Sequence, residues 1–305
     1  MAELILHHFD LSPFAEKVRL MFGLKGLSWA SVDIPLVMPK PDLTALTGGY
    51  RKTPVLQIGA DIYCDTRLIA IELEARFPHP TFFPSGNRGM SLALSAWSDR
   101  AFFEPGAGLS MGLNKGGLPE AIINDRKAFF NFMDFGTLEQ EIPHLSTQLR
   151  AQADLVNQQL ADGRAYMFGD SPGLADIHAY FVVWMTRGNV PTADRLFAGF
   201  DWMMSWERRM QAIGHGKRQP LSVAAAHAAA RRSSPLPGSG VDPNDDSGLA
   251  VGERVVVTPD DYGRVPVTGE LVTMTLHEVA VRRSDPAIGP LVVHFPRIGY
   301  RVVKA

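Results

Sequence analysis

The first αβ unit of the chain begins with LILHHFDLSPFAEKVRLMFGLKG, residues 4–26. Its first six residues form a short, mostly apolar run, which is typical of a buried strand. Ser12-Pro13 follows, and Ser at the N-cap with Pro at the first helical position is a common way for a helix to begin. Apolar residues then recur at mostly helical spacings up to Leu24, and Gly26 follows soon after. The stretch therefore predicts a strand, a short loop and a helix.

The rest of the first 80 residues continues to alternate between strand and helix signals. Predicted strands cover 29–34, 54–58 and 62–64, and the last two form a hairpin around Gly59-Ala60-Asp61. A short irregular helix is expected over 39–46, and a longer one over 65–77, which Pro78 ends. The order βαβαββα with a mixed sheet is the thioredoxin-like arrangement. We place this domain at 1–80.

The middle of the chain, 88–232, reads as helical almost throughout. Apolar and aromatic residues recur every three or four positions, which predicts an all-helical domain of about five to seven helices. The expected breaks include Pro105-Gly106, Pro143 and Pro172-Gly173. Ser, Pro, Gly and Asp then dominate 233–248, so this segment is predicted to be a linker with too few apolar residues to pack.

The pattern changes period after the linker. Short β-rich runs separated by turn signals predict a small β-barrel-like module over 249–305, near the size limit for independent folding. The runs are 254–257, 270–272, 278–281, 291–293 and 300–303. The expected fold class is an α/β thioredoxin-like N-terminal domain plus an all-α helical-bundle domain, followed by a small all-β module.

Composition disfavours several classes of protein. Hydrophobic residues make up 46% and charged residues 20% of the 305 positions, which supplies packed cores and shows no sign of general disorder. The net charge of -2 and the pI near 6.5 give no reason to expect nucleic acid or an anionic membrane as a partner. The one cysteine, Cys64, cannot form an internal disulfide and fits a reducing compartment. Without a signal-peptide pattern or an apolar stretch near the ~20 residues of a membrane helix, a cytoplasmic protein is expected.

Ser12 has two interpretations. As an N-cap it satisfies a free backbone N–H at the start of the helix, which is the commoner role. The same geometry points a hydroxyl and the positive end of a helix at one spot, where a bound thiolate would gain a charge-assisted hydrogen bond. Free thiols titrate near ~8.5, and lowering that pKa by about two requires only ~2.7 kcal/mol. One hydroxyl together with a helix end can supply that amount.

Two further pairs have similar dual interpretations. Thr53-Pro54 is an ordinary strand start if its peptide bond is trans, whereas a cis bond would turn the main chain of Thr53 outward to pair with an extended peptide. Asp65-Thr66 are ordinary capping residues. A helix N-terminus with a hydroxyl is also a ready carboxylate site, and Asp65 could receive an amino group.

Together these spacings resemble the glutathione transferase superfamily, over about residues 1–215. Ser12–Arg19 resembles the serine- or cysteine-type first-helix motif, Tyr50–Leu56 the cis-proline segment, and Asp65–Ala70 the acidic-hydroxyl pair with its helix. The three motifs occur in order and at workable spacings. No family is recognised for the C-terminal β module.

The resemblance implies a role for each of these residues. Ser12 would be the catalytic residue that donates a hydrogen bond to the glutathione thiolate. The main chain of Thr53 would pair with the cysteinyl backbone, and Asp65 and Thr66 would hold the γ-glutamyl group. The residues expected to bind glutathione are Phe14, Lys40, Lys52, Thr53, Pro54, Asp65 and Thr66.

Two lysines compete for the glycine carboxylate of glutathione. Lys52 lies where the family often has a polar residue near that carboxylate, and Lys40 is the alternative. No metal site is expected, because His7 and His8 are neighbours on a strand, face opposite ways, and have no clustered ligand beside them. Both histidines are therefore interpreted as structural.

A fourth match lies in the helical domain. Gly169–Asp176 resembles the family's capping-box segment, in which a Ser or Thr three residues before the Asp caps a buried helix. Gly173 stands at that place here, so the side-chain acceptor is missing, although Gly is tolerated at N-caps at modest cost. We expect Asp176 to bond back to the Gly173 backbone in a structural role.

Serine at position 12 separates the chain from the redox branch of the family. A cysteine there would favour mixed-disulfide chemistry, which Ser12 cannot perform, and Cys64 is interpreted as a small buried hydrophobe. The resemblance implies a glutathione transferase, with glutathione as co-substrate, a small electrophilic and largely apolar second substrate, and a homodimer. The alternative is a non-catalytic glutathione-binding or protein-interaction protein that uses the C-terminal module. A thiol-dependent reductase is disfavoured.

Overall fold

The computed structural model describes residues 3–305, which divide into two compact units. The first unit comprises the chain up to Ala15, Ser28–Glu72 and Lys217–Ala305. The second comprises Glu16–Leu27 and Leu73–Gly216. Among the helices of the described residues, none is both long and apolar enough to cross a membrane.

The N-terminal part of the first unit is a thioredoxin-like fold, as the sequence predicted. Strand β1 (Leu4–His8) runs parallel to β2 (Ser28–Asp33) and antiparallel to β3 (Val55–Ile58), which pairs with β4 (Asp61–Cys64). Helix α2 (Pro41–Thr47) lies within this unit. Helices α1 (Pro13–Leu24) and α3 (Thr66–Arg76) begin in it and continue into the second unit. The element order is therefore βαβαββα, confirming the prediction.

The C-terminal strands extend this sheet. They are β7 (Arg254–Pro259), β8 (Val267–Met274), β9 (Glu278–Asp285), β10 (Gly289–Pro296) and β11 (Tyr300–Lys304), so the five β-rich runs are confirmed as strands. Strand β10 pairs parallel with β4, with Val293 opposite Ile62, and the others continue outward in the order β9-β8-β7-β11. An unpaired strand edge offers a row of free N–H and C=O groups, and β10 satisfies those of β4.

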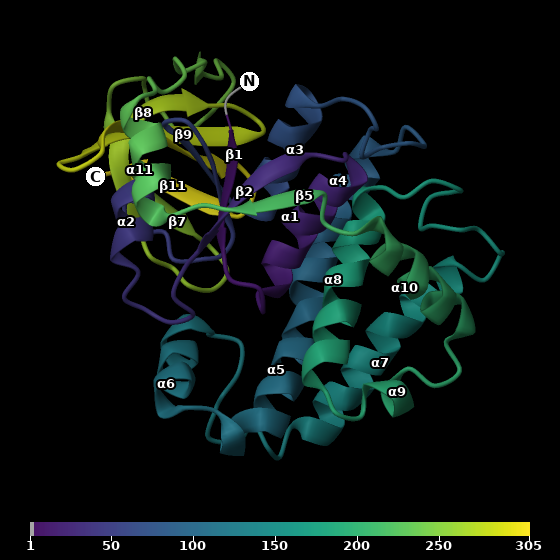
Figure 1. The fold of residues 1–305 in the computed structure, drawn as a ribbon. Coiled ribbons are helices and arrows are strands. Elements are labelled where there is room, and N and C mark those ends of the chain that lie inside the picture. The colour runs from purple at the N-terminus through teal and green to yellow at the C-terminus, as the bar shows by residue number, and fades with distance from the viewer. Residues whose placement is uncertain (1–2) are drawn as a thin grey trace. The chain divides into compact units, whose positions relative to one another are not determined.

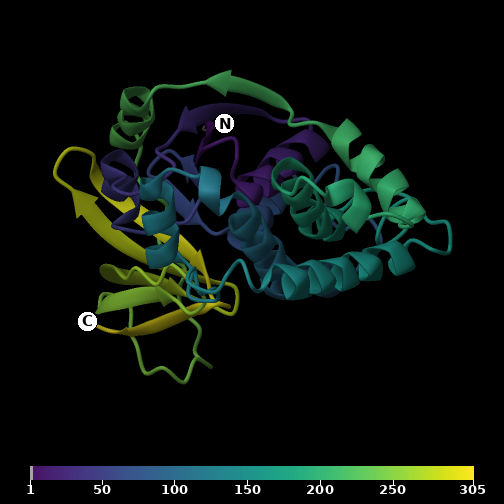
Figure 2. The ribbon, with the colours of Figure 1, turned by 90° about the horizontal axis from the view of Figure 1, so that it is seen from below.

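The opposite edge carries a strand that the sequence did not predict. Strand β5 (Lys217–Pro220) pairs parallel with β2, although the helical domain was expected to run to residue 232 (Figure 1). All four residues of β5 are exposed, so no apolar pattern indicates the strand. Helix α11 (Val223–Arg231) follows it within the first unit, and Figure 2 lets the chain be followed from β5 through α11 toward the yellow C-terminal strands. Within 233–248, the short strand β6 (Gly240–Val241) pairs with β8.

One apolar core joins the thioredoxin-like strands to the C-terminal strands. Val55 and Ile62 belong to the same buried cluster as Val281, Val293 and Phe295. Removing this apolar surface from water favours the joined arrangement over a detached module. The predicted domain boundaries themselves remain predictions.

The second unit is built of helices. They are α4 (Arg88–Ala96), α5 (Phe103–Asn114), α6 (Glu120–Phe129), α7 (Ile142–Gln159), α8 (Leu174–Asn189), α9 (Ala193–Leu196) and α10 (Asp201–Ile213), with a π-helical turn at Trp97–Phe102 and a 3-10 turn at Lys115–Gly117. The break predicted at Pro105-Gly106 is wrong, since Pro105 lies in the first turn of α5. The π-helical turn runs directly into α5, because Phe102 and Phe103 both keep helical backbone angles and the Phe103 N–H bonds to carbonyls of that turn.

Asp176 organises the start of the buried helix α8. Its Oδ2 accepts a hydrogen bond from the Gly173 N–H at 3.0 Å, which confirms the predicted back-bond. Its Oδ1 accepts two further bonds, from the Met167 N–H and the Trp206 indole N–H, both at 2.8 Å. Burial raises the pKa of Asp176 to about 6, against the opposing effect of these hydrogen bonds. Asp176 thus ties three segments of the second unit together.

Candidate functional site

Ser12 lies at the start of α1 in the first unit. Its Oγ accepts a hydrogen bond from the Ala15 N–H at 3.2 Å, so the N-cap interpretation is confirmed. Within the described residues its hydroxyl hydrogen has no acceptor, although the side chain is only 3% exposed. Serine can donate and accept at once, so capping leaves one donor for a ligand. Phe14 follows in the same first turn and is half-buried.

Thr53 and Pro54 lie just before β3. Their peptide bond is cis, as the family resemblance implied. The β3 ladder begins at Val55, so the main chain of Thr53 is not committed to the sheet. Met38-Pro39 and His79-Pro80 are also cis, and the sequence analysis did not anticipate either.

Asp65 begins helix α3 with an uncommon backbone conformation. Its φ is 76°, and it is the one non-glycine residue with positive φ in the described part of the chain. Such conformations cost about 1–3 kcal/mol and concentrate at functional sites. Its Oδ1 accepts from the Arg67 N–H at 3.0 Å, which confirms the capping role. The neighbouring hydroxyl of Thr66 has no partner among residues 3–305 and is nearly buried.

The two candidate lysines have different environments. The Nζ of Lys40 lies 3.4 Å from the Thr53 Oγ1 and 5.3 Å from the centre of the Phe9 ring. The Nζ of Lys52 lies 2.5 Å from Oδ1 of Asp261 and 4.5 Å from the centre of the Tyr262 ring. Lys52 is therefore already ion-paired to the C-terminal strand region.

Tyr300 of β11 reaches the same site and was missed by the sequence analysis. Its Oη lies 3.2 Å from Oδ2 of Asp65 and 3.2 Å from the Oη of Tyr50. Burial raises the pKa of both phenols well above the ordinary value, so both remain protonated donors. Tyr300 is 235 residues from Asp65 in sequence. No local signal could have found it.

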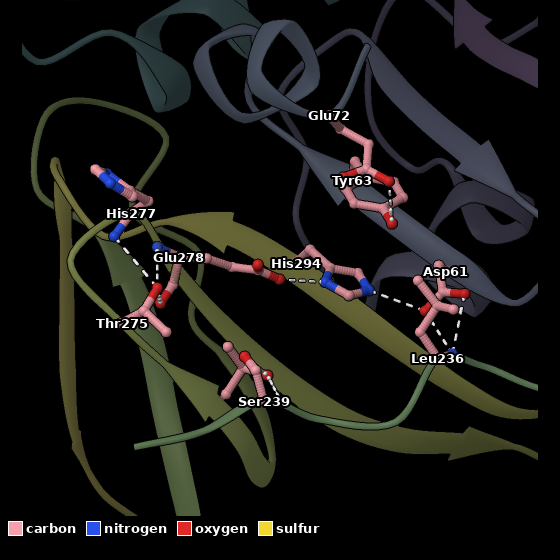
Figure 3. Close-up of polar contacts among 10 residues, drawn as sticks. Asp61, Tyr63, Glu72, Leu236, Ser239, Thr275, His277, Glu278 and His294 are labelled. Carbon is pink, nitrogen blue, oxygen red and sulfur yellow. Dashed lines mark hydrogen bonds and ion pairs between the residues drawn. The ribbon is translucent and has the colours of Figure 1, made fainter. Parts of the chain in front are cut away.

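A buried charged network joins β4 to the C-terminal strands (Figure 3). The imidazole of His294 lies between Asp61, with Nε2 3.0 Å from its Oδ1, and Glu278, with Nδ1 2.5 Å from its Oε1. Asp61 also accepts from the Leu236 N–H, and the Tyr63 ring stacks on the imidazole at 4.5 Å. Burial alone would lower the pKa of His294, but the hydrogen bonds and charges of the two carboxylates raise it.

The remaining polar candidates have structural partners. His7 Nε2 lies 2.8 Å from Oε1 of Gln57, and His8 Nε2 lies 2.9 Å from Oγ of Ser31, which agrees with the structural interpretation of both histidines. Cys64 is fully buried, and burial, followed by the charge of Asp65, raises its thiol pKa well above the ordinary value. The interpretation of Cys64 as a buried hydrophobe is confirmed.

Comparison with known proteins places the chain in a family. The family model for the glutathione S-transferase N-terminal domain matches residues 6–81, and that for the C-terminal domain matches residues 122–212. The chain is similar to a GST-like protein from Pseudomonas syringae, with 38% identity over 100% of both chains and a TM-score of 0.81. The chain belongs to the glutathione transferase superfamily. No curated protein matches it.

More distant glutathione transferases share only the fold. A glutathione S-transferase from Rhodospirillum rubrum F11 aligns with 68% of this chain and 88% of its own, at 22% identity and a TM-score of 0.52. A theta class enzyme from Xanthomonas axonopodis pv. citri, solved with glutathione bound, aligns with 70% of this chain and 93% of its own, at 16% identity and a TM-score of 0.50. The family-model matches end at residue 212, whereas the Pseudomonas syringae match includes the C-terminal strands.

Proposed function

We propose that this superfamily member is a glutathione transferase-like enzyme, in which Ser12 stabilises the glutathione thiolate for attack on an electrophilic, largely apolar substrate. The observation that carries the proposal is the spare hydroxyl donor of Ser12 at the N-terminus of α1. A hydrogen bond to a thiolate and the positive helix end both favour the ionised form of a thiol.

The same residues supply positions for the rest of glutathione. The uncommitted main chain of Thr53 suits pairing with the cysteinyl backbone. The carboxylate of Asp65 suits the γ-glutamyl ammonium, and the hydroxyl of Thr66 with the first turn of α3 suits the adjacent carboxylate. Lys40 and Lys52 both remain candidates for the glycine carboxylate: the Lys40 Nζ lies 3.4 Å from the Thr53 Oγ1, and Lys52 is ion-paired with Asp261.

The proposed reaction needs no residue that changes oxidation state. The thiol proton is lost to water, and Ser12 holds the resulting thiolate by a hydrogen bond. The sulfur then forms a bond to an electrophilic carbon of the substrate. In a substitution the bond from that carbon to the leaving group breaks; in an addition the electron pair of the double bond moves to the adjacent atom, which takes a proton from water. Positioning of both reactants and stabilisation of the nucleophile supply the rate.

The test begins with calorimetric titration of glutathione into the purified protein. We expect micromolar-to-millimolar binding, which the double variant Asp65→Ala/Thr66→Ala loses. Ser12→Ala should keep that binding but lose most turnover in an electrophile screen, because the hydroxyl acts on the ionised sulfur. Equal turnover by Ser12→Ala would remove Ser12 from the mechanism, and absence of binding by the unmodified protein would refute the glutathione site.

A second candidate is a non-catalytic glutathione-binding or protein-interaction role that uses the C-terminal strands. Leu276 is 73% exposed and Ile298 65% exposed, and their two turns are joined by a hydrogen bond from the Arg297 N–H to the His277 carbonyl. Exposed apolar side chains on two hydrogen-bonded turns could contribute to one contact surface. Retained glutathione binding without turnover of any electrophile, with a partner lost on Leu276→Ser/Ile298→Ser, would support this role.

The superfamily also suggests an assembly and a location. We propose that the protein forms a homodimer and resides in the cytoplasm. Analytical ultracentrifugation of the full chain tests the first point, and fractionation of source cells tests the second.

A further inference from the structure

We propose that the C-terminal strands form part of the glutathione site, with Tyr300 as the positioning residue for Asp65. This inference rests on the proposed function, because it assigns the γ-glutamyl ammonium of glutathione to Asp65. It adds a site residue from a segment that lies outside the superfamily models, which end at residue 212.

The phenol of Tyr300 is held in place by its surroundings. Strand β11 pairs with β7, and Tyr300 lies opposite Pro259 in that ladder. The Tyr300 ring packs 5.4 Å from the ring of Phe295, and the side chain is 5% exposed. Phe295 in turn contacts the Tyr50 ring edge-on at 5.8 Å. Because the ring cannot swing out without opening this core, its hydroxyl is a fixed donor.

The direction of the hydrogen bonds follows from the number of hydrogens. An ionised carboxylate only accepts, so Tyr300 must donate its one hydrogen to Asp65. The Oη of Tyr300 is then free to accept, and Tyr50 can donate to it. The raised pKa of each phenol keeps both hydrogens in place at neutral pH. A chain of donors therefore runs from Tyr50 through Tyr300 to Asp65.

This chain fixes the orientation of the Asp65 carboxylate. Oδ1 accepts from the Arg67 N–H on one side, and Oδ2 accepts from Tyr300 on the other. Each oxygen retains a second lone pair, so an ammonium group can still be accepted. A carboxylate held in one orientation loses less conformational entropy when it binds that ammonium, which strengthens binding.

A second contact links the same region of the chain to the site. Asp261 pairs with Lys52, and the Tyr262 ring covers the same ammonium. Lys52 and Asp65 flank the cis Thr53–Pro54 segment in sequence, and each contacts the C-terminal region. The contact at Asp65 is therefore accompanied by a contact of the same C-terminal region with a second candidate glutathione residue, Lys52.

The test compares two ligands and two phenylalanine variants by calorimetry with the full chain. The ligands are glutathione and its analogue without the γ-glutamyl amino group. Tyr300→Phe removes only the hydroxyl that meets Asp65. Tyr63→Phe is the matched control, because it removes a hydroxyl of the same unit that bonds Glu72 instead.

We expect Tyr300→Phe to weaken glutathione binding about 3- to 10-fold, equivalent to about 0.7–1.4 kcal/mol. Its affinity for the analogue should equal that of the unmodified protein, because that ligand lacks the group that Asp65 binds. Tyr63→Phe should leave both affinities unchanged. In turnover assays, the KM for glutathione should rise while kcat at saturating glutathione stays the same.

Four outcomes would overturn the inference. Tyr300→Phe could bind glutathione as well as the unmodified protein, or it could lose affinity for both ligands equally. Absence of glutathione binding by the unmodified protein would refute the proposed function itself and this inference with it. Should Tyr300→Phe fail to fold, Tyr50→Phe removes the donor to Tyr300 without touching Asp65. It should give a smaller loss in the same direction, confined to glutathione, and no loss would overturn the inference.

Discussion

Replacing His294 by leucine should destabilise the joint between β4 and β10. The change keeps an apolar body of similar size but removes the imidazolium from between Asp61 and Glu278. The Asp61 side chain is 6% exposed, so water replaces little of its lost interaction, whereas that of Glu278 is 27% exposed and is partly solvated. Breaking a buried ion pair by removing one partner costs about 3–5 kcal/mol. We expect a loss of that size in the free energy of unfolding.

The pH dependence gives the sharper signature. The folded-state pKa of His294 is raised, so the folded protein holds this proton more tightly than the unfolded chain does. Its contribution to stability is complete below the unfolded-state pKa of about 6.5 and is lost as pH rises through the folded-state value. Each pH unit by which the folded-state pKa exceeds the unfolded-state value contributes about 1.4 kcal/mol. The stability of His294→Leu should not show this decrease as pH rises.

Urea unfolding followed by circular dichroism, at a series of pH values from 6 upward, measures both effects. Adding Asp61→Asn and Glu278→Gln to His294→Leu should recover part of the stability, because no uncompensated buried carboxylate then remains. A His294→Leu protein as stable as the unmodified one, with the same dependence on pH, would refute the assigned role of this network.

Three further predictions concern single residues. Burial lowers the pKa of His7 to about 4, so the folded protein binds this proton less readily than the unfolded chain does. As pH falls from about 6.5 to about 4, the free energy of unfolding of the unmodified protein should therefore fall by about 3 kcal/mol more than that of His7→Gln, as measured by urea unfolding. Asp176→Asn places an amide N–H₂ among hydrogen-bond donors, and the unsatisfied groups should lower the free energy of unfolding by about 1–3 kcal/mol. Thermal unfolding at pH 7 measures the change, and an unchanged Tm would contradict the role assigned to the three bonds. Asp65→Ala should lower the free energy of unfolding by about 2 kcal/mol, because it removes the cap and places alanine in a left-handed backbone conformation. Asp65→Gly should lower it clearly less, because glycine adopts that conformation freely. Equal losses in the two variants would show that φ is not the cause.

Much of the candidate site could be predicted from the sequence, because its signals are local. Two helix starts can be predicted from residue type alone: Ser12 before Pro13, and Asp65 before Thr66. Both residues form the expected caps. The spacing of three motifs pointed to the superfamily, and that resemblance implied the cis bond at Pro54. What each residue contacts beyond its own turn could not be predicted in this way.

The sequence by itself predicted the βαβαββα order of the first 80 residues, the five C-terminal strands, and the caps at Ser12 and Asp65. The tertiary structure alone decided that the C-terminal strands continue the β4 edge, that β5 pairs with β2, and that Tyr300 meets Asp65. Periodicity and capping act over a few residues, so they can be read along the chain. Edge pairing joins residues 189 positions apart between β2 and β5 and 231 positions apart between β4 and β10. A short stretch of sequence therefore cannot show which strand edge or which carboxylate a distant strand will contact.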